Sequence, residues 1–261
     1  MSDREISKAL RATRGNVELA AKSLAGKGPP FCMSKFVLND KIGSGAFGEV
    51  YNVFDREKGE TIALKVAFEK LENPIQNEID VVQRLTTLQV RNIVEFRGTG
   101  RCNLLDNRVY YGMHIEDGTM ESFMKHGNKL DGPAFFSLFF EMVFTLSQFS
   151  EHGFQHRDIK ADNILYRNVP QAREYALPGG RTFLATGTTQ PIFADFNTGQ
   201  FKPDFEIASD AVSLWETVIA PLIEEHVFMD EDEEEKLQEV ANLYFEVEAG
   251  KFDAVLKKIA E

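Results

Sequence analysis

Hydrophobic and polar residues alternate along residues 35–68, and this period of two predicts β-strands. The segments that show it read KFVLNDKIG, GEVYNVFD and TIALKVAF, with turn residues between them. A helix is predicted over residues 74–85, because its apolar residues recur at helical spacing. That stripe consists of Ile75, Ile79, Val82 and Leu85. The segments NIVEF and VYYGMHI predict two more strands, so this half of the chain is expected to be β-rich.

The pattern becomes mainly helical after Gly118. ESFMKH predicts a short helix, and residues from about 133 to 152 predict a long apolar one. Two further helical segments follow near the end of the chain. The sequence therefore predicts an α+β protein with a β-rich lobe at 35–115, a helical lobe at 116–261 and a hinge near His114–Gly118.

Residues 1–34 have a different pattern and are expected to form a helical N-terminal arm and a linker. Residues 3–25 carry apolar positions at helical spacing, and GKGPPF follows as the linker. The stretch TRGNVELAAKSLAG superficially resembles the last helices of a ubiquitin-associated or helix-turn-helix module. It is too short for either module, so an arm packed on the main domain is the favoured interpretation.

Composition and charge exclude several classes of protein. The chain has 261 residues and a net charge of −12, which argues against a general nucleic-acid surface. No apolar run approaches the ~18 residues of a membrane helix, and MSDREISKAL is not a signal segment. Cys32 and Cys102 lack metal-like or redox spacing, so reduced thiols are expected. The expected location is the cytoplasm; the nucleus and the interior of a host cell are the alternatives.

Six consecutive acidic residues occupy positions 230–235. The favoured interpretation is a solvated helix start, where negative charge suits the helix dipole. The alternative is a surface that steers a basic substrate.

A glycine-rich stretch, Gly43-Ser44-Gly45-Ala46-Phe47-Gly48, fits the pattern G-x-G-x-x-G. The segment after it is strand-like, so the glycines are expected to cap a hairpin rather than to begin a helix. Glycines allow backbone N–H groups to approach phosphate oxygens closely. A glycine-rich hairpin without a ligand is the alternative.

Lys65 lies in the apolar segment IALKVA, where an unpaired ammonium group would be costly. Glu78, on the helix-like segment that follows, is the expected anionic partner. The alternative is a lysine that reaches solvent at a strand edge.

The segment HGFQHRDIKADNILYR brings together a carboxylate, an ammonium group and a carboxamide: Asp158, Lys160 and Asn163. Phosphoryl transfer needs a base for the substrate hydroxyl, a cation for the transferred group and oxygen ligands for Mg²⁺. Asp195, after the apolar segment PIFA, would supply a second metal ligand. A polar turn between a helix and a strand is the alternative.

These motifs occur in the order found in eukaryotic-type protein kinases, which the chain resembles from about residue 36 to about 225. The resemblance implies a bilobal kinase-like fold with a reduced helical lobe. It implies that Lys65 holds the α- and β-phosphates of ATP and pairs with Glu78, and that Asp158 is the catalytic base. Asn163 and Asp195 would bind Mg²⁺, or Mn²⁺ in its place. Lys160, two residues after Asp158, follows the pattern of serine/threonine-specific members.

The resemblance also implies a nucleotide site. His156 is expected to be a packed core histidine, and Met113 lies at the back of the adenine slot, with His114 to Glu116 as the hinge. The residues expected to contact the nucleotide are Ile42, Gly43, Gly45, Phe47, Gly48, Val50, Ala63, Lys65, Met113, His114, Glu116 and Leu165.

The sequence departs from the family pattern at three places. Asn197 replaces a glycine after Asp195-Phe196. The change is interpreted as mild, because asparagine is among the few other residues that tolerate a positive φ and because Asp195 is unchanged. REYALPGGRTFLAT predicts an inserted hairpin, which is similar to elaborated segments of haspin and some viral protein kinases. The activation segment is short: FNTGQFKPDFEIAS alone separates Asp195 from Asp210, the expected buried aspartate of the next helix.

We therefore expect an ATP- and Mg²⁺-dependent serine/threonine kinase that acts on a protein substrate, with a basic substrate as one option. Thr198 and Ser209 are the only hydroxyl residues in the short segment, so activity is expected without an activation-loop switch. The alternatives are a pseudokinase that serves as a binding or scaffold module, and a small-molecule kinase on a related fold.

Overall fold

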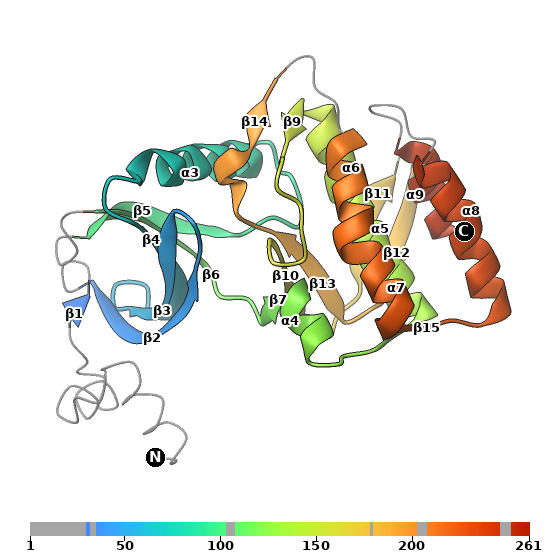
Figure 1. The fold of residues 1–261 in the computed structure, drawn as a ribbon, viewed down its shortest axis with the longest axis horizontal. Helices are drawn as coiled ribbons and strands as arrows, with labels where there is room; N and C mark the ends of the chain where they lie inside the picture. The colour runs from blue at the N-terminus through green and yellow to red at the C-terminus, as the bar shows by residue number, and fades with distance from the viewer. Residues whose placement is uncertain (1–29, 32–34, 103–107, 178–179, 203–207, 246–251) are drawn as a thin grey trace, which may run out of the picture. The chain divides into compact units, whose positions relative to one another are not determined.

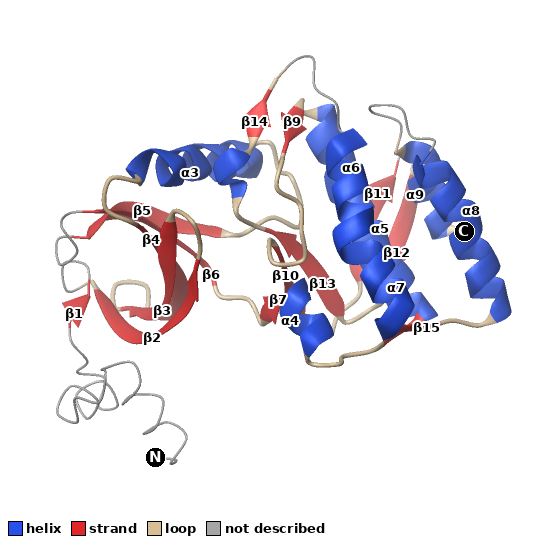
Figure 2. Ribbon diagram, viewed as in Figure 1, coloured by secondary structure: helices blue, strands red, loops and turns tan. Residues whose placement is uncertain are grey.

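The computed structural model describes residues 30–31, 35–102, 108–177, 180–202, 208–245 and 252–261. Of the arm and linker expected at residues 1–34 it describes only Pro30–Phe31, which form a short strand rather than a linker. The chain divides into two compact units. The first holds the described residues up to Gln83 together with Val94–Ile115, and the second holds Arg84–Ile93 together with the described residues from Glu116 onward. Strands dominate the first unit and helices the second (Figure 2), as expected for this α+β class.

The first unit is built on a six-stranded antiparallel sheet (Figure 1) with the order β1-β2-β3-β4-β6-β5. The strands predicted between residues 35 and 68 are confirmed as β2, β3 and β4. In β4 every residue from Ile62 to Ala67 is buried, which explains its continuous apolar sequence. The bounds are β1 Pro30–Phe31, β2 Phe36–Ser44, β3 Gly48–Asp55, β4 Glu60–Ala67, β5 Phe96–Cys102 and β6 Arg108–His114.

The helix predicted after these strands is α3 (Glu72–Thr87), and its apolar stripe is confirmed as buried. The helix begins two residues before Pro74, since proline is tolerated in the first helical turn.

The predicted strand NIVEF is wrong. Asn92 has a positive φ of 56°, which interrupts the extended backbone, and Ile93 forms an isolated bridge with Phe193. The strand begins only at Phe96.

The expectation of two reduced thiols is also wrong. Cys102, buried at the end of β5, is disulfide-bonded. The only other cysteine in the chain is Cys32, which lies outside the described residues. The cysteines therefore give no support for a reducing compartment.

The second unit is organised around α5 (Gly132–Glu151), the predicted long apolar helix. Asp131 caps it by accepting a hydrogen bond from the Ala134 amide at 2.9 Å, and Pro133 lies in its first turn. Its residues are buried without a break from Phe135 to Val143, as in a helix covered on all sides. Among the described residues, no helix combines the length and apolar character that crossing a membrane requires.

Apart from α8, the other described elements of this unit are short. Those before the insertion are β7 Gly118–Thr119, α4 Met120–Lys125, β8 Leu130–Asp131, β9 Phe154–Gln155 and β10 Ile164–Asn168. Those after it are β13 Thr189–Phe193, the 3₁₀-helix η1 Phe196–Thr198, β14 Gln200–Phe201, α6 Ala208–Leu214, the π-helix η2 Trp215–Ile219, α7 Ala220–His226, β15 Val227–Phe228, α8 Glu231–Phe245 and α9 Asp253–Ala260.

Two further predictions about these helices are confirmed. The predicted helix around Asp210 is present and runs as α6, η2 and α7, with a π-helical stretch that the sequence did not reveal. The acidic run lies at the start of α8, whose first turn holds four acidic residues, as the helix-dipole interpretation expects.

The inserted hairpin is confirmed as β11 (Arg173–Leu177) and β12 (Arg181–Ala185), which pair antiparallel; residues 178–179 of its turn lie outside the described part. The ring of Phe183 stacks on Phe140 of α5, with 3.7 Å between the centroids. The hairpin therefore packs on the central helix.

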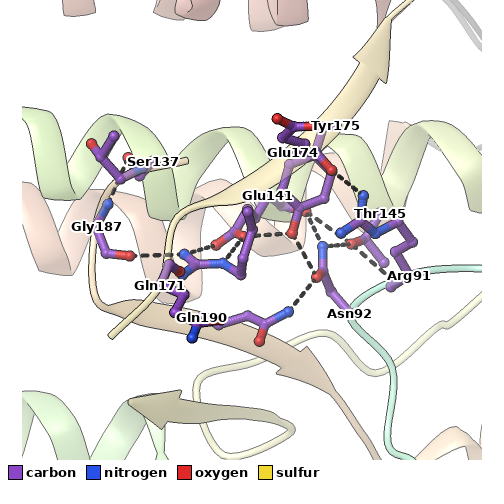
Figure 3. Close-up of polar contacts among 12 residues, drawn as sticks. Arg91, Asn92, Ser137, Glu141, Thr145, Gln171, Glu174, Tyr175, Gly187 and Gln190 are labelled. Carbon is purple, nitrogen blue, oxygen red and sulfur yellow. Dashed lines mark hydrogen bonds and ion pairs between the residues drawn. The ribbon is translucent and has the colours of Figure 1, made fainter. Parts of the chain in front are cut away.

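A buried polar network fixes the hairpin to α5 (Figure 3). Nε and Nη2 of Arg173 donate to the two carboxylate oxygens of Glu141, at 2.6 and 3.0 Å. The hydroxyl of Tyr175 donates to Glu141 at 2.5 Å and lies 3.0 Å from the side-chain oxygen of Asn92. That oxygen also accepts a 3.0 Å hydrogen bond from Gln190 of β13. Because Glu141 is fully buried, these bonds stabilise a charge that burial alone would make costly.

We expect Tyr175→Phe to lower the free energy of unfolding of this unit by about 1–3 kcal/mol, because it removes the hydroxyl partner of a buried carboxylate. Urea unfolding followed by the fluorescence of Trp215, the single tryptophan, measures the loss. Tyr166→Phe is the matched control, since the half-buried Tyr166 ring packs edge-on against Phe123 and keeps that contact. Equal effects of the two substitutions would contradict a special role for the Tyr175 hydroxyl.

Candidate active site

The glycine-rich stretch forms the turn between β2 and β3. The Gly45 amide donates to the Gly48 carbonyl at 2.9 Å and closes the turn. A Cβ atom on Gly45 would meet nothing within 4 Å, whereas one on Gly48 would lie 2.4 Å from the Val66 carbonyl oxygen of β4. Gly48 is thus required by close strand packing, while the space around Gly45 leaves its backbone open to a ligand.

Strand register brings several of the expected nucleotide residues of the first unit into one row. Gly43 of β2 pairs with Val50 of β3, Val50 with Lys65 of β4, and Lys65 with Tyr111 of β6. Ala63 pairs with Met113 two positions along. Because residues directly opposite one another on antiparallel strands have their side chains on the same face, Gly43, Val50 and Lys65 share one face of the sheet.

Lys65 and Glu78 form the expected ion pair, with 2.6 Å between Nζ and Oε2. The Lys65 side chain is 9% exposed and the Glu78 side chain is fully buried. The hydroxyl of Tyr111 donates to the other carboxylate oxygen of Glu78 at 2.5 Å. A buried pair is stable only when further hydrogen bonds satisfy its remaining atoms, and Tyr111 supplies one. Sequence reasoning missed Tyr111, because only strand register places it beside Lys65.

The other residues expected to contact a nucleotide have mixed environments. Ile42 is 47% exposed, Ala63 and Met113 are buried, and Leu165 in the second unit is half-buried. The carboxylate of Glu116 accepts two hydrogen bonds from Arg167, at 2.8 and 2.7 Å. Its side chain therefore has a structural partner, and a hinge contact to a nucleotide would come from its backbone.

A buried carboxylate holds the segment of the second unit that carries Asp158, the expected catalytic base. Asp210 of α6 is 1% exposed and accepts hydrogen bonds from the backbone amides of His156 and Arg157, at 2.6 and 2.9 Å. Arg157 has a φ of 69°, a left-handed conformation that non-glycine residues adopt at a cost. The two hydrogen bonds hold this conformation and so fix the backbone that leads into Asp158.

Asp158, Lys160 and Asn163 are brought together as expected. The ammonium group of Lys160 lies 2.9 Å from Oδ2 of Asp158. Nδ2 of Asn163 donates to the same oxygen and to the Asp158 backbone carbonyl, both at 2.8 Å. The hydrogen bond to Asp158 raises the pKa of Lys160, with a smaller contribution from the charge of Asp195. The Asp158 carboxylate therefore contacts a cation and remains partly open to solvent.

Strand pairing also brings the two expected metal ligands to one end of a sheet. β10 follows Asn163, β13 precedes Asp195, and Ile164 pairs with Phe193. The Ala194 amide donates to the Asn163 carbonyl at 2.9 Å.

The donor set fits a magnesium ion held jointly with a nucleotide. Since Nδ2 of Asn163 is used by Asp158, the oxygen Oδ1 is the atom of that amide suited to a cation. The described residues contain no group of three or more His, Cys, Asp or Glu that could hold a metal alone. Mg²⁺ in such sites takes a carboxylate and substrate phosphates, which matches one carboxylate and one amide.

Asn197 does not have the positive φ that asparagine would tolerate at this position. Asn197 lies in η1, and the left-handed residue is Asp195 itself, with a φ of 61°. Nδ2 of Asn197 donates to Oδ1 of Asp195 at 2.5 Å. The Asn197 side chain thus contacts the carboxylate of Asp195, the expected metal ligand.

Both hydroxyl residues of the short segment are engaged in hydrogen bonds. Thr198 donates to the His156 carbonyl at 3.0 Å, and Ser209 accepts from the Gln155 side chain at 2.6 Å. Residues 203–207 between them lie outside the described part.

Comparison with known proteins assigns the class. The chain matches the family model for the protein kinase domain over residues 36–173, more than half of its length. The chain therefore belongs to the protein kinase domain family, as a divergent eukaryotic-type member. The matched region ends at the first residue of β11, so the inserted hairpin and Asp195 lie beyond it.

Several protein kinases are similar to the chain over about half of its length. Cell division control protein 7 of Schizosaccharomyces pombe is 32% identical over 136 residues, which are 51% of this chain and 12% of that protein. MAP3K epsilon protein kinase 1 of Arabidopsis thaliana is 31% identical over 140 residues, 51% of this chain and 10% of that protein. Dual specificity testis-specific protein kinase 1 of Mus musculus is 30% identical over 132 residues, which are 49% of this chain and 20% of that protein. The chain thus spans only a small part of each relative.

His156 is a packed core histidine, as expected. It is fully buried, its Nε2 lies 2.9 Å from the Ala194 carbonyl, and its ring lies 4.9 Å from the ring of Phe196. Burial lowers the pKa of His156 from its ordinary 6.5, against the opposing charge of Asp210.

This shift predicts a pH dependence of stability. The folded protein keeps His156 neutral below pH 6.5, whereas the unfolded chain takes up a proton there. Stability therefore falls as the pH drops from 6.5 toward the lower folded pKa, by up to about 1.4 kcal/mol per pH unit. Urea unfolding followed by Trp215 fluorescence, at about pH 7.5 and about pH 5.5, measures the fall. His156→Gln should reduce the difference between the two pH values, and His152→Gln should leave it unchanged. An unchanged difference in His156→Gln would refute the assignment.

Proposed function

We propose that this chain is an ATP- and Mg²⁺-dependent protein kinase that transfers the γ-phosphoryl group to serine or threonine hydroxyls of a protein. The observation that carries the proposal is the arrangement of Asp158, Lys160 and Asn163 on one anchored segment. The family membership and the similarity to protein kinases support it. The position of Lys160 supports the choice of serine and threonine.

Each residue has one chemical role in this proposal. Asp158 accepts the proton of the substrate hydroxyl as the new bond from oxygen to the γ-phosphorus forms. The bond from that phosphorus to the β-phosphate oxygen breaks, and ADP leaves. Lys160 balances negative charge on the transferred group, and its contact with Asp158 orients both side chains. A bound Mg²⁺ would neutralise phosphate charge through Asn163 and Asp195.

Lys65 would hold the α- and β-phosphates. Its contact with Glu78 fixes the ammonium group, and Tyr111 fixes Glu78 in turn. The glycine-rich turn would approach the phosphates through backbone amides, for which the open surroundings of Gly45 leave space.

We further propose that activity does not require phosphorylation of the short segment. The support is that Asp210 already holds the backbone before Asp158, and that Thr198 and Ser209 already have protein hydrogen-bond partners.

Asp158→Asn tests the proposed base. We expect phosphoryl transfer from γ-labelled ATP to protein to fall by about 10²- to 10⁴-fold or more, because the amide cannot accept the hydroxyl proton. Asp162→Asn, four positions later in the same segment, is the matched control and should retain activity. Thermal stabilisation of both variants by Mg-ATP would show that nucleotide binding is intact.

Three outcomes would overturn parts of this assignment. A wild-type transfer rate in Asp158→Asn would refute the role of the base. Stabilisation by nucleotide without any transfer by the wild type would favour a scaffold. Transfer to soluble hydroxyl compounds but to no protein would favour a small-molecule kinase.

A further inference from the structure

A groove of about 370 Å³ lies between α7 and α8, away from the residues assigned to catalysis. Its lining is mainly apolar and half-buried. The larger apolar side chains come from η2, α7, β15, the residue after it and α8: Trp215, Ile223, Val227, Met229 and Leu237. Such a surface is incompletely covered by the fold itself.

An exposed aromatic ring lies next to this groove, since Phe245 at the end of α8 is 57% exposed. Phe228 is 66% exposed but is not a lining residue; its neighbours Val227 and Met229 line the groove, and the ammonium group of Lys129 lies 5.5 Å from the centroid of its ring. Phe228 and Phe245 are the two most exposed large apolar side chains among the described residues. Phe245 contacts the lining residue Trp215, with ring centroids 4.9 Å apart. Apolar surface concentrated at a groove in this way marks an interaction site more often than isolated exposed residues do.

The charge at the groove has one sign. Glu224 of α7 and Glu234 of α8 are its only charged lining residues, and among the described residues neither takes part in an ion pair. Two neighbouring acidic residues are already used within the fold, because Asp230 and Glu233 cap α8 through reciprocal hydrogen bonds of 3.1 and 2.9 Å. Glu224 and Glu234 have no such structural use.

We propose that this groove, lined by apolar residues and by Glu224 and Glu234, is a docking site for a basic amphipathic segment of the protein substrate. Apolar side chains of that segment would enter the groove, and its Lys or Arg residues would meet the two carboxylates. Docking modes of this kind use apolar anchors at helical spacing. The inference rests on the proposed kinase function, and it supplies a means of holding substrate where the short segment between Asp195 and Asp210 leaves little chain for a peptide platform.

Binding of a labelled peptide tests the site independently of catalysis. The probe is a short synthetic peptide with leucines at helical spacing flanked by lysine and arginine, and fluorescence anisotropy follows its binding. The double variant Glu224→Lys/Glu234→Lys should weaken binding about tenfold, which corresponds to about 1.4 kcal/mol. Leu237→Ser should weaken it as well. Higher salt should reduce the loss of peptide binding caused by Glu224→Lys/Glu234→Lys, but not the loss caused by Leu237→Ser.

The matched control is Glu225→Lys/Asp232→Lys, which makes the same change of charge on the same two helices outside the groove lining. It should change peptide binding by less than about twofold. Equal weakening by both double variants would show steering by net charge and overturn the groove. Binding that appears only after removal of residues 1–29 would show that the chain's own N-terminal segment is the occupant, and would also overturn the proposal.

Kinetics separate this proposal from the proposed function. With a serine acceptor fused to the same peptide, Glu224→Lys/Glu234→Lys should raise KM about tenfold without changing kcat, and an acceptor without the peptide should be unaffected. Peptide binding without any phosphoryl transfer by the wild type would refute the kinase function alone. Transfer with identical KM for the fused and unfused acceptors would refute the docking site alone.

Discussion

The hydrogen bonds that Asp210 accepts from the backbone of His156 and Arg157 are the constraint on which the segment of the proposed base, Asp158, depends. They hold Arg157 in a left-handed conformation that would otherwise relax, and that conformation directs the chain into Asp158. Because Asp210 is buried, its carboxylate has no water to replace these two donors. The geometry of Asp158, Lys160 and Asn163 follows from this anchor, which belongs to the folded helix α6 and not to a modified loop.

The inserted hairpin stabilises the same unit by a second route. It lies in sequence between β10 and β13, the strands that adjoin Asn163 and Asp195. Its network joins Arg173 to Glu141 of α5 and reaches β13 through Asn92 and Gln190. An insertion at this position would otherwise loosen the two strands. The buried polar contacts make it part of the scaffold that holds the expected metal ligands.

Contacts that follow from the chemistry of a short stretch of sequence could be predicted. An ammonium group in the apolar strand β4 needs an acidic partner, and the predicted ion pair of Lys65 with Glu78 is present. Contacts that depend on distant segments could not be predicted. Tyr111 reaches Glu78 only through strand register, and the hairpin network joins residues far apart in the chain. For Asn197 the sequence indicates the conformational tolerance of its backbone. The hydrogen bond from its side chain to Asp195 depends on the folded turn, which the sequence does not reveal.

We propose that the fold alone places the segment that carries Asp158 for phosphoryl transfer. This proposal is tested most directly by the transfer rate from γ-labelled ATP to protein after phosphatase treatment, with complete loss of phosphate at Thr198 and Ser209 verified by mass spectrometry. We expect the same transfer rate before and after phosphatase treatment, within about twofold, because Asp210 already holds the segment. A rate that vanishes on treatment and returns when either residue is phosphorylated again would contradict it.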